Sequence, residues 1–140
     1  AAHIVFDAWP DLTLVSWETT LAHTLNADLL CEWKKWNTPA VQFYNRISGS
    51  IMDFMKQRLA EDILPTADVL AMAVALEPSI VQETIHRPLM MELAGRYTRG
   101  QTVIDWNHRS KKSAQAEVVL KVDMQRFTSL AALPFKPAST

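Results

Sequence analysis

One short helix that is apolar on every side constrains this chain more than any other feature. The run VLAMAVAL, Val69–Leu76, contains no polar residue, and Pro65-Thr66 and Glu77-Pro78 bound it. A proline near each end is typical of a helix that starts and stops there. A helix that is apolar all round is normally buried all round. We therefore predict a helix over Ala67–Leu76 that the rest of the fold encloses.

Length and composition are sufficient for one such core. The chain has 140 residues, of which 49% are hydrophobic and 21% charged, and a net charge of −1. A chain of this length buries roughly 65–70% of its unfolded surface. The hydrophobic content excludes a disordered segment, and the near-neutral charge argues against a nucleic-acid binder. The apolar run is far shorter than the roughly 20 residues that span a bilayer, so we expect no membrane partner.

Other helices are indicated by capping residues and apolar spacing. Ala1–Ala8 is apolar on all sides, which is typical of the end of a buried helix. A helix is predicted over Ala27–Trp36, with Asn26 as its cap. A second begins at Thr38-Pro39 and runs to about Glu61, with a weak point at Ser48-Gly49-Ser50. A third, amphipathic helix is capped by Asp123 and ends at Leu133.

Short apolar runs between turn residues predict strands. They cover Leu12–Ser16, Ile80–Ile85, Pro88–Leu93, Thr102–Asp105 and Glu117–Val122. Helices mixed with short strands predict an α/β fold. We expect one domain over residues 1–133, followed by a flexible tail over residues 134–140.

Common catalytic and metal-binding signatures are absent from the sequence. The 3 glycines fit no phosphate-binding loop, and neither CxxC nor HExxH occurs. The histidines are scattered, so each is interpreted as a surface or hydrogen-bonded residue; they are His3, His23, His86 and His108. Cys31, the one cysteine, cannot form an internal disulfide and is interpreted as a small buried hydrophobe. The five tryptophans are interpreted as core residues rather than a base-stacking platform.

The segment before the apolar helix has two interpretations. Thr66 is a suitable N-cap, and Asp68 in the first turn favours the positive end of the helix dipole by about 0.3–1 kcal/mol. Alternatively, a carboxylate fixed at the start of a buried helix is a rigid oxygen ligand for a cation.

A second notable segment is GRYTRGQTVID, Gly95–Asp105. Gly100, between polar turns and a strand, indicates a backbone position with positive φ. Tyr97 and Arg99 either line a cleft or belong to a tight connection between strands, and the connection is the commoner case.

In order and spacing, these segments resemble the C-terminal portion of the inosine/uridine-preferring nucleoside hydrolases. ADVLAMAVALEP is similar to the family's aspartate-headed helix, and TRGQTVIDW is similar to a late family motif. AAHIVFDAWPDLTLVSWETT and VVLKVDMQRF resemble the segments that open and close this portion.

The resemblance implies an α/β fold and hydrolysis of the N-glycosidic bond of a ribonucleoside. It also implies a bound calcium ion held by aspartates, with Asp68 as the metal ligand that this chain contributes. The partner is then a small-molecule ribonucleoside, with a homo-oligomer as a further option. The expected compartment is the cytoplasm.

The chain departs from the family in two respects. The Asp-rich N-terminal motif, which supplies most metal ligands, does not occur in these residues, and Ala67 stands where many members carry His. Other acids, such as Asp53, Glu61 and Asp62, lie on or just after a predicted helix rather than at a strand end. We assign no catalytic residue and expect this chain to be inactive without the family's N-terminal half. The alternative is a non-catalytic remnant or interaction module.

Overall fold

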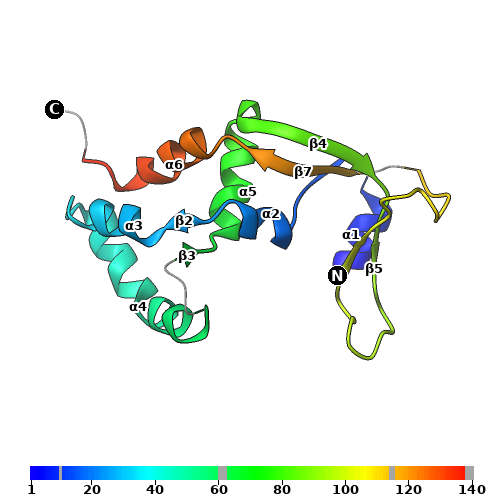
Figure 1. Ribbon diagram of the computed structural model, residues 1–140, viewed down its shortest axis with the longest axis horizontal. Coiled ribbons are helices and arrows are strands. Elements are labelled where there is room, and N and C mark those ends of the chain that lie inside the picture. The colour runs from blue at the N-terminus through cyan, green and yellow to red at the C-terminus, as the bar shows by residue number, and fades with distance from the viewer. Residues whose placement is uncertain (10, 60–62, 114–115, 138–140) are drawn as a thin grey trace.

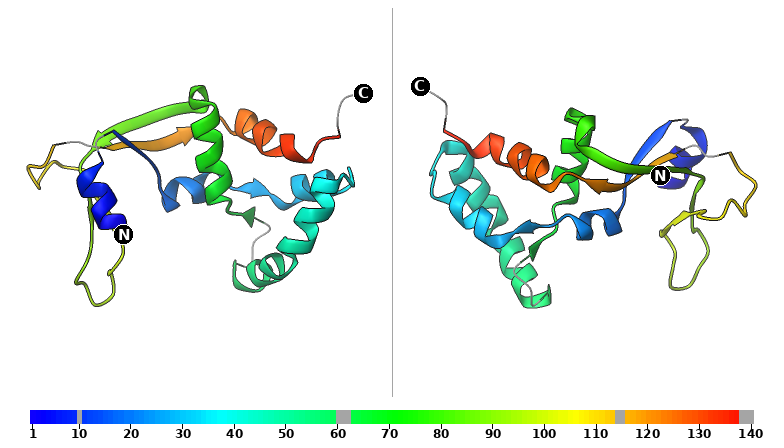
Figure 2. Two further views of the ribbon diagram at one scale, coloured as in Figure 1. Left: turned by 180° about the vertical axis from the view of Figure 1, so that it is seen from behind. Right: turned by 45° about the horizontal axis from the view of Figure 1, so that its top comes forward.

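A computed structural model describes residues 1–9, 11–59, 63–113 and 116–137, and at residues 27, 50–59 and 63–64 it describes the backbone alone. The molecule is elongated (Figure 1). Helices α3 (Ala27–Lys34), α4 (Pro39–Leu59) and α6 (Met124–Ala132) gather at one end. The other end holds the strands and α1 (Ala2–Ala8), and α5 (Ala67–Leu76) lies between the two ends in all views (Figure 2).

A mixed three-stranded sheet organises the strand end. Its order is β1 (Leu12–Val15), β7 (Ala116–Val122) and β4 (Val81–Arg87). β1 runs parallel to β7, whereas β4 runs antiparallel to it. The sheet with its flanking helices confirms the predicted α/β class, and β1 forms one edge of the sheet.

The remaining elements are short. Two two-stranded ladders form, one from β2 (Leu25–Asn26) and β3 (Ile63–Leu64), the other from β5 (Leu89–Met91) and β6 (Thr102–Ile104). The 3-10 helices are η1 (Pro78–Ile80) and η2 (Leu133–Phe135). A helix absent from the sequence prediction, α2, covers Trp17–Ala22. The Ser16 hydroxyl caps α2 by accepting from Thr19 N at 3.2 Å, a signal that the sequence contained.

Two predicted caps are confirmed. Asn26 Oδ1 accepts from Asp28 N at 2.7 Å, and Asp123 Oδ1 accepts from Gln125 N at 3.0 Å and Arg126 N at 3.1 Å. The predicted weak point in α4 is wrong, since the helix continues through Gly49. One glycine costs a helix only about 1 kcal/mol relative to alanine, which is too little to break 21 residues. The predicted end at Glu61 lies outside the described residues.

The core consists of two clusters that meet at β7. The larger one joins α5, α6, η1 and α3, with Phe127, Leu70 and Ile80 fully buried. The smaller one is formed around Leu89 and Val118 between the sheet and the β5–β6 hairpin. The β7 residues of the two clusters are interleaved along the strand, with Val118 in the smaller cluster and Val119 in the larger one, so β7 joins the two ends of the molecule.

The prediction that α5 is enclosed is wrong. Leu70, Ala73 and Val74 are buried, but other apolar residues of the same helix are open to solvent; these are Val69 at 41%, Met72 at 58% and Leu76 at 74% exposure. Within the described residues, α5 packs against α6, α2, β1 and η1, which cover one side of it. The helix α1 likewise has no buried residue, contrary to its prediction.

Other burial predictions are also corrected. Cys31 is exposed rather than buried. On α3 the buried residues are Leu30 and Trp33, and a helix turns about 100° per residue, so Cys31 falls away from that side. Of the tryptophans, Trp33 is buried and Trp36 packs against the core, but three are more than half exposed, namely Trp9, Trp17 and Trp106.

The segment after α6 begins with packed residues. Phe135 in η2 contacts the Trp33 and Tyr44 rings, with centroids 6.0 and 5.3 Å away. The Thr38 hydroxyl donates to Phe135 O at 3.0 Å, which ties η2 to the start of α4. Residues 138–140 of the predicted tail lie outside the described residues. Of the helices that the structure describes, none has the length and apolarity to cross a membrane.

Candidate functional site

The N-terminus of α5 carries the sequence-predicted metal ligand. Asp68 lies in the first helical turn with its side chain exposed. Thr66 occupies the N-cap position, but its hydroxyl caps no backbone N–H, so that part of the prediction is wrong. The residues that do cap, Ser16, Asn26 and Asp123, have ψ of 169°, 138° and 106°, whereas ψ of Thr66 is 69°. The backbone at Thr66 therefore departs from the extended conformation of these three caps.

The Thr66 hydroxyl is unusual because it is a polar group in a buried position. Its Oγ1 atom is buried and has no hydrogen-bond partner within the part of the chain that the structure describes. A buried hydroxyl without a partner costs roughly 1–3 kcal/mol of stability. This hydroxyl therefore lies two residues from Asp68 without a partner among the described residues.

An apolar cavity of about 420 Å³ opens beside this helix end. Its volume is within the range of small-molecule pockets. Thr66 and Asp68 at the start of α5 and Tyr44 of α4 are among its lining residues. The remaining lining residues are apolar and come from α3, α5, α6, η2 and β2. The cavity lining is therefore almost wholly apolar, and Asp68 is its one acidic residue among those described.

These residues do not by themselves fit a calcium ion. Calcium takes 6–8 oxygen ligands. Among the residues that the structure describes, no group of three or more His, Cys, Asp or Glu side chains is placed to hold a metal. Of the other acids considered, the side chain of Asp53 is not described, and Glu61 and Asp62 lie outside the described residues.

The segment GRYTRGQTVID forms the β5–β6 hairpin. Gly100 has φ +90°, as predicted, and its N–H donates to Glu92 O at 2.8 Å. Tyr97 is 88% exposed, with the Arg96 guanidinium 5.2 Å from its ring centroid. Of the two interpretations of this segment, the tight strand connection describes the geometry.

Two carboxylates organise the turns around this hairpin, and the sequence prediction missed both roles. Asp105 accepts from Ser110 N at 2.7 Å and Arg109 N at 2.9 Å. These bonds, with the Ser110 hydroxyl contributing most, lower the pKa of Asp105 from 3.8 to about 2. Glu92 accepts from Ala94 N and Gly95 N, which lowers its pKa as well. In the sequence, an acidic residue followed by a polar turn would have predicted that its carboxylate accepts hydrogen bonds from the backbone of that turn.

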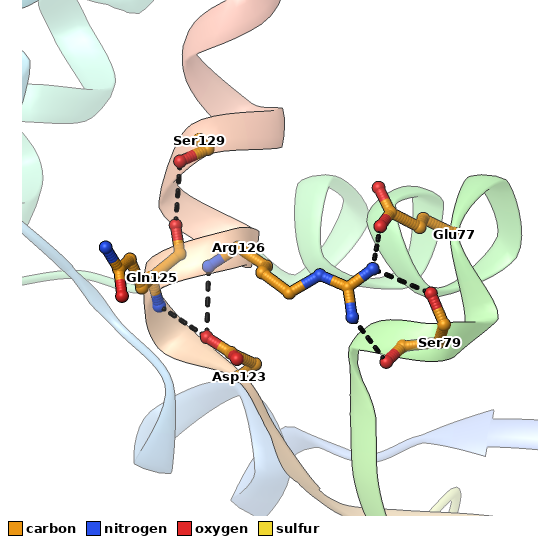
Figure 3. Close-up of polar contacts among 6 residues, drawn as sticks. All are labelled: Glu77, Ser79, Asp123, Gln125, Arg126 and Ser129. Carbon is orange, nitrogen blue, oxygen red and sulfur yellow. Dashed lines mark hydrogen bonds and ion pairs between the residues drawn. The ribbon is translucent and has the colours of Figure 1, made fainter.

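The opposite end of α5 is fixed by Arg126 of α6 (Figure 3). Its guanidinium donates to Ser79 O at 2.8 Å and Ser79 Oγ at 2.7 Å, and it forms an ion pair with Glu77. Glu77 and Ser79 form the turn between α5 and β4. Arg126 therefore fixes the C-terminal end of the helix whose first turn carries Asp68.

The histidines lie as predicted, on the surface or hydrogen-bonded. His3 pairs with Asp7 at 3.3 Å, and His86 and His108 are exposed. His23 is buried, with Nδ1 2.7 Å from Thr19 O, and its Nε2 accepts from Val122 N at 3.1 Å. Because Nε2 accepts, Nδ1 carries the proton and donates. His23 thus joins α2 to β7 as a structural residue.

Comparison with known proteins gives one consistent result. Residues 1–129 match the family described as inosine-uridine preferring nucleoside hydrolase. The chain is 26% identical over 130 residues to the inosine-uridine preferring nucleoside hydrolase of Crithidia fasciculata, covering 93% of this chain and 41% of the relative. It is 28% identical over 134 residues to a pyrimidine-specific ribonucleoside hydrolase of Klebsiella pneumoniae, covering 94% and 42%.

The fold agrees with this match. A solved inosine-guanosine nucleoside hydrolase superposes with a TM-score of 0.82 at 22% identity, over 95% of this chain and 42% of that one. The chain thus spans about two fifths of the length of the curated relatives it matches. With nearly every residue aligned in sequence and in space, the chain belongs to the inosine-uridine preferring nucleoside hydrolase family.

Proposed function

We propose that this chain is the C-terminal portion of a ribonucleoside hydrolase, an enzyme that uses water to cleave the N-glycosidic bond and releases base and ribose. The observation that carries the proposal is the placement of Asp68. Asp68 lies in the first turn of α5 and is among the residues that line an apolar cavity, in a chain matched to the family over residues 1–129. On this proposal the portion covers residues 1–133, and residues 134–140 follow it.

Asp68 would supply one oxygen ligand to calcium. Its position in the first turn of a helix packed against α6 restricts its movement, which is what a metal ligand needs. Calcium takes 6–8 oxygens, so the remaining ligands and the carboxylate that deprotonates water would come from parts of the family's fold outside these residues. The apolar cavity would keep bulk water away from a bound nucleoside.

The activity test uses a chimera. This chain would replace the matching 41% of the Crithidia fasciculata relative, and ribose release from inosine and uridine would be measured with calcium present. We expect release by the chimera and none by the 140-residue chain alone. Asp68→Asn in the chimera should abolish release, because an amide is a neutral and weaker ligand. Asp28→Asn is the matched control, since Asp28 is also an exposed aspartate in the first turn of a helix.

The outcomes separate two classes of protein. An inactive chimera that folds and binds calcium would contradict the hydrolase proposal, as would full activity of Asp68→Asn. The second candidate is a non-catalytic interaction module, and the observation that favours it is that the described residues place one acidic residue, Asp68, at the site, beside Ala67. That candidate predicts a chimera in which millimolar calcium gives no rise in thermal stability, since a ligand that binds the native state stabilises it by RT ln(1 + [L]/Kd).

A further inference from the structure

We propose that His23 is an acid-sensitive latch, which holds α2 to β7 while its imidazole is neutral and releases α2 when the ring takes up a proton. The His23 latch consists of the ring itself, Thr19 O on one side of it and Val122 N on the other. The inference goes beyond the proposed function and does not rest on it, because the proposed hydrolysis makes no use of this buried side chain.

The His23 latch lies where β1 ends. β1 pairs with β7 as far as Val15 and Val119, and α2 follows β1 directly along the chain. Two side chains then bond the β7 backbone. Thr19 Oγ1 of α2 donates to Val119 O at 2.7 Å, and Nε2 of His23, the C-cap residue of α2, accepts from Val122 N at 3.1 Å. The α2 segment therefore continues the attachment to β7 that β1 begins.

The two hydrogen bonds of the ring require its neutral form. Nδ1 lies 2.7 Å from the carbonyl oxygen of Thr19, which can only accept, so Nδ1 carries the proton. Nε2 receives the N–H of Val122, so it must keep its lone pair. An imidazolium carries a proton on both nitrogens and accepts no hydrogen bond. Protonation of His23 therefore breaks the bond to Val122 and sets two N–H groups against each other.

The surroundings of the ring offer no compensation for a positive charge. His23 is only 6% exposed, and a buried charge needs a partner. Within the part of the chain that the structure describes, the ring forms no ion pair with a carboxylate. β1 and β2, which adjoin α2 in sequence, carry no ionisable side chain. The ionisable side chains of α2, of β7 and its end, and of the first turn of α5 are Glu18, Glu117, Lys121, Asp123 and Asp68, and none of them bonds to the ring.

The His23 latch stabilises the fold at neutral pH and loses this contribution in acid. Histidine in an unfolded chain titrates at about pH 6.5. Below that pH the unfolded state takes up a proton that the latched state excludes, so the equilibrium moves towards unfolding. For one histidine the limit of this effect is a factor of about 30 in the unfolding equilibrium constant between pH 8 and pH 5. Asp105, with a pKa of about 2, stays ionised over this range.

Release of the latch affects more than one hydrogen bond. Thr19 and Thr20 of α2 are buried, and α2 packs against α5 as well as against β7. Once His23 leaves Val122, we expect α2 to be the first helix to lose protection from hydrogen exchange. The side of α5 that α2 covers should open with it. A buried histidine that changes the packing of an element on protonation acts as a pH sensor.

The test compares urea unfolding of the 140-residue chain at pH 8 and pH 5. His23→Gln is the informative variant, because an amide offers a donor and an acceptor at both pH values. Between pH 8 and pH 5, the unfolding equilibrium constant of the parent chain should rise at least about tenfold more than that of His23→Gln. In hydrogen exchange at pH 5, the Val122 amide of the parent chain should lose protection while the amides of the β5–β6 hairpin keep theirs.

A reciprocal chain keeps His23 as its one histidine. It carries His3→Gln, His86→Gln and His108→Gln, and it should show the pH dependence of the parent chain. This chain decides the question by itself if His23→Gln does not fold. Equal pH dependence of the parent chain and His23→Gln, loss of that dependence in the reciprocal chain, or equal protection of the Val122 amide at both pH values would overturn the latch. The opposite results would support it, whether or not the proposed hydrolase activity is found.

Discussion

At the scale of single residues, His23 is a buried polar side chain that links a helix to the sheet. It hydrogen-bonds Thr19 O of α2 and also Val122 N of β7, which is 99 positions further along the sequence than His23. His23→Ala leaves both backbone groups without this partner, so we expect the free energy of unfolding to fall by roughly 1–3 kcal/mol. Urea denaturation measures this. His86→Ala, at an exposed histidine, should change stability by less than about 0.5 kcal/mol, and equal losses would contradict the bridging role.

Asp105 predicts a pH dependence. Its pKa is lowered from 3.8 to about 2 by hydrogen bonds from Ser110 and Arg109, so the carboxylate stabilises the fold above pH 3.8. This contribution should be lost as the pH falls from 3.8 towards 2. Relative to Asp105→Asn, the parent chain should be more stable at pH 5 and lose that advantage by pH 2. Chemical denaturation at both pH values tests this, and a constant difference would be the contrary result.

At the scale of elements, Arg126 connects α6 to the turn between α5 and β4. It reaches a carboxylate, a hydroxyl and a carbonyl at once. Arg126→Met should lower the free energy of unfolding by about 1 kcal/mol, because the contacts are partly exposed. Arg126→Lys should not restore it fully, since an ammonium lacks the planar fork of the guanidinium. Thermal denaturation measures both variants, with Arg99→Met as the exposed control. A lysine variant as stable as the parent chain would contradict the role of the planar guanidinium.

Element boundaries were largely predictable from sequence, but burial was not. Asn26, Asp123 and the prolines around α5 act locally, so their effects could be predicted from neighbouring residues. The exposure of α5, Trp9 and Trp106 depends on which distant segments are present to cover them, and no local pattern reports that. For the same reason the sequence led to Asp68 but not to the cavity beside it, which needs α3, α4 and η2 in place.

At the scale of the whole molecule, the two core clusters should open separately. Phe127 is fully buried in the larger cluster and Leu89 in the smaller one, and the clusters meet at β7. Phe127→Ala should cost about 3–5 kcal/mol and expose the amides of α5 and α6 to hydrogen exchange while the β5–β6 hairpin stays protected. Leu89→Ala should do the opposite. Simultaneous loss of protection at both ends in either variant would mean a single cooperative unit.

The exposure of Cys31 has a practical consequence for studying this chain. It is the one cysteine among 140 residues, and its thiol faces solvent on α3. A maleimide fluorophore will therefore attach at a single defined position, a few residues from the buried indole of Trp33. Energy transfer to that dye from Trp33 and Trp36, the two tryptophans near Cys31 in sequence, would report on the helical end once the other three tryptophans are replaced. Under oxidising storage the same thiol will crosslink pairs of chains through an intermolecular disulfide, so a reductant keeps preparations homogeneous.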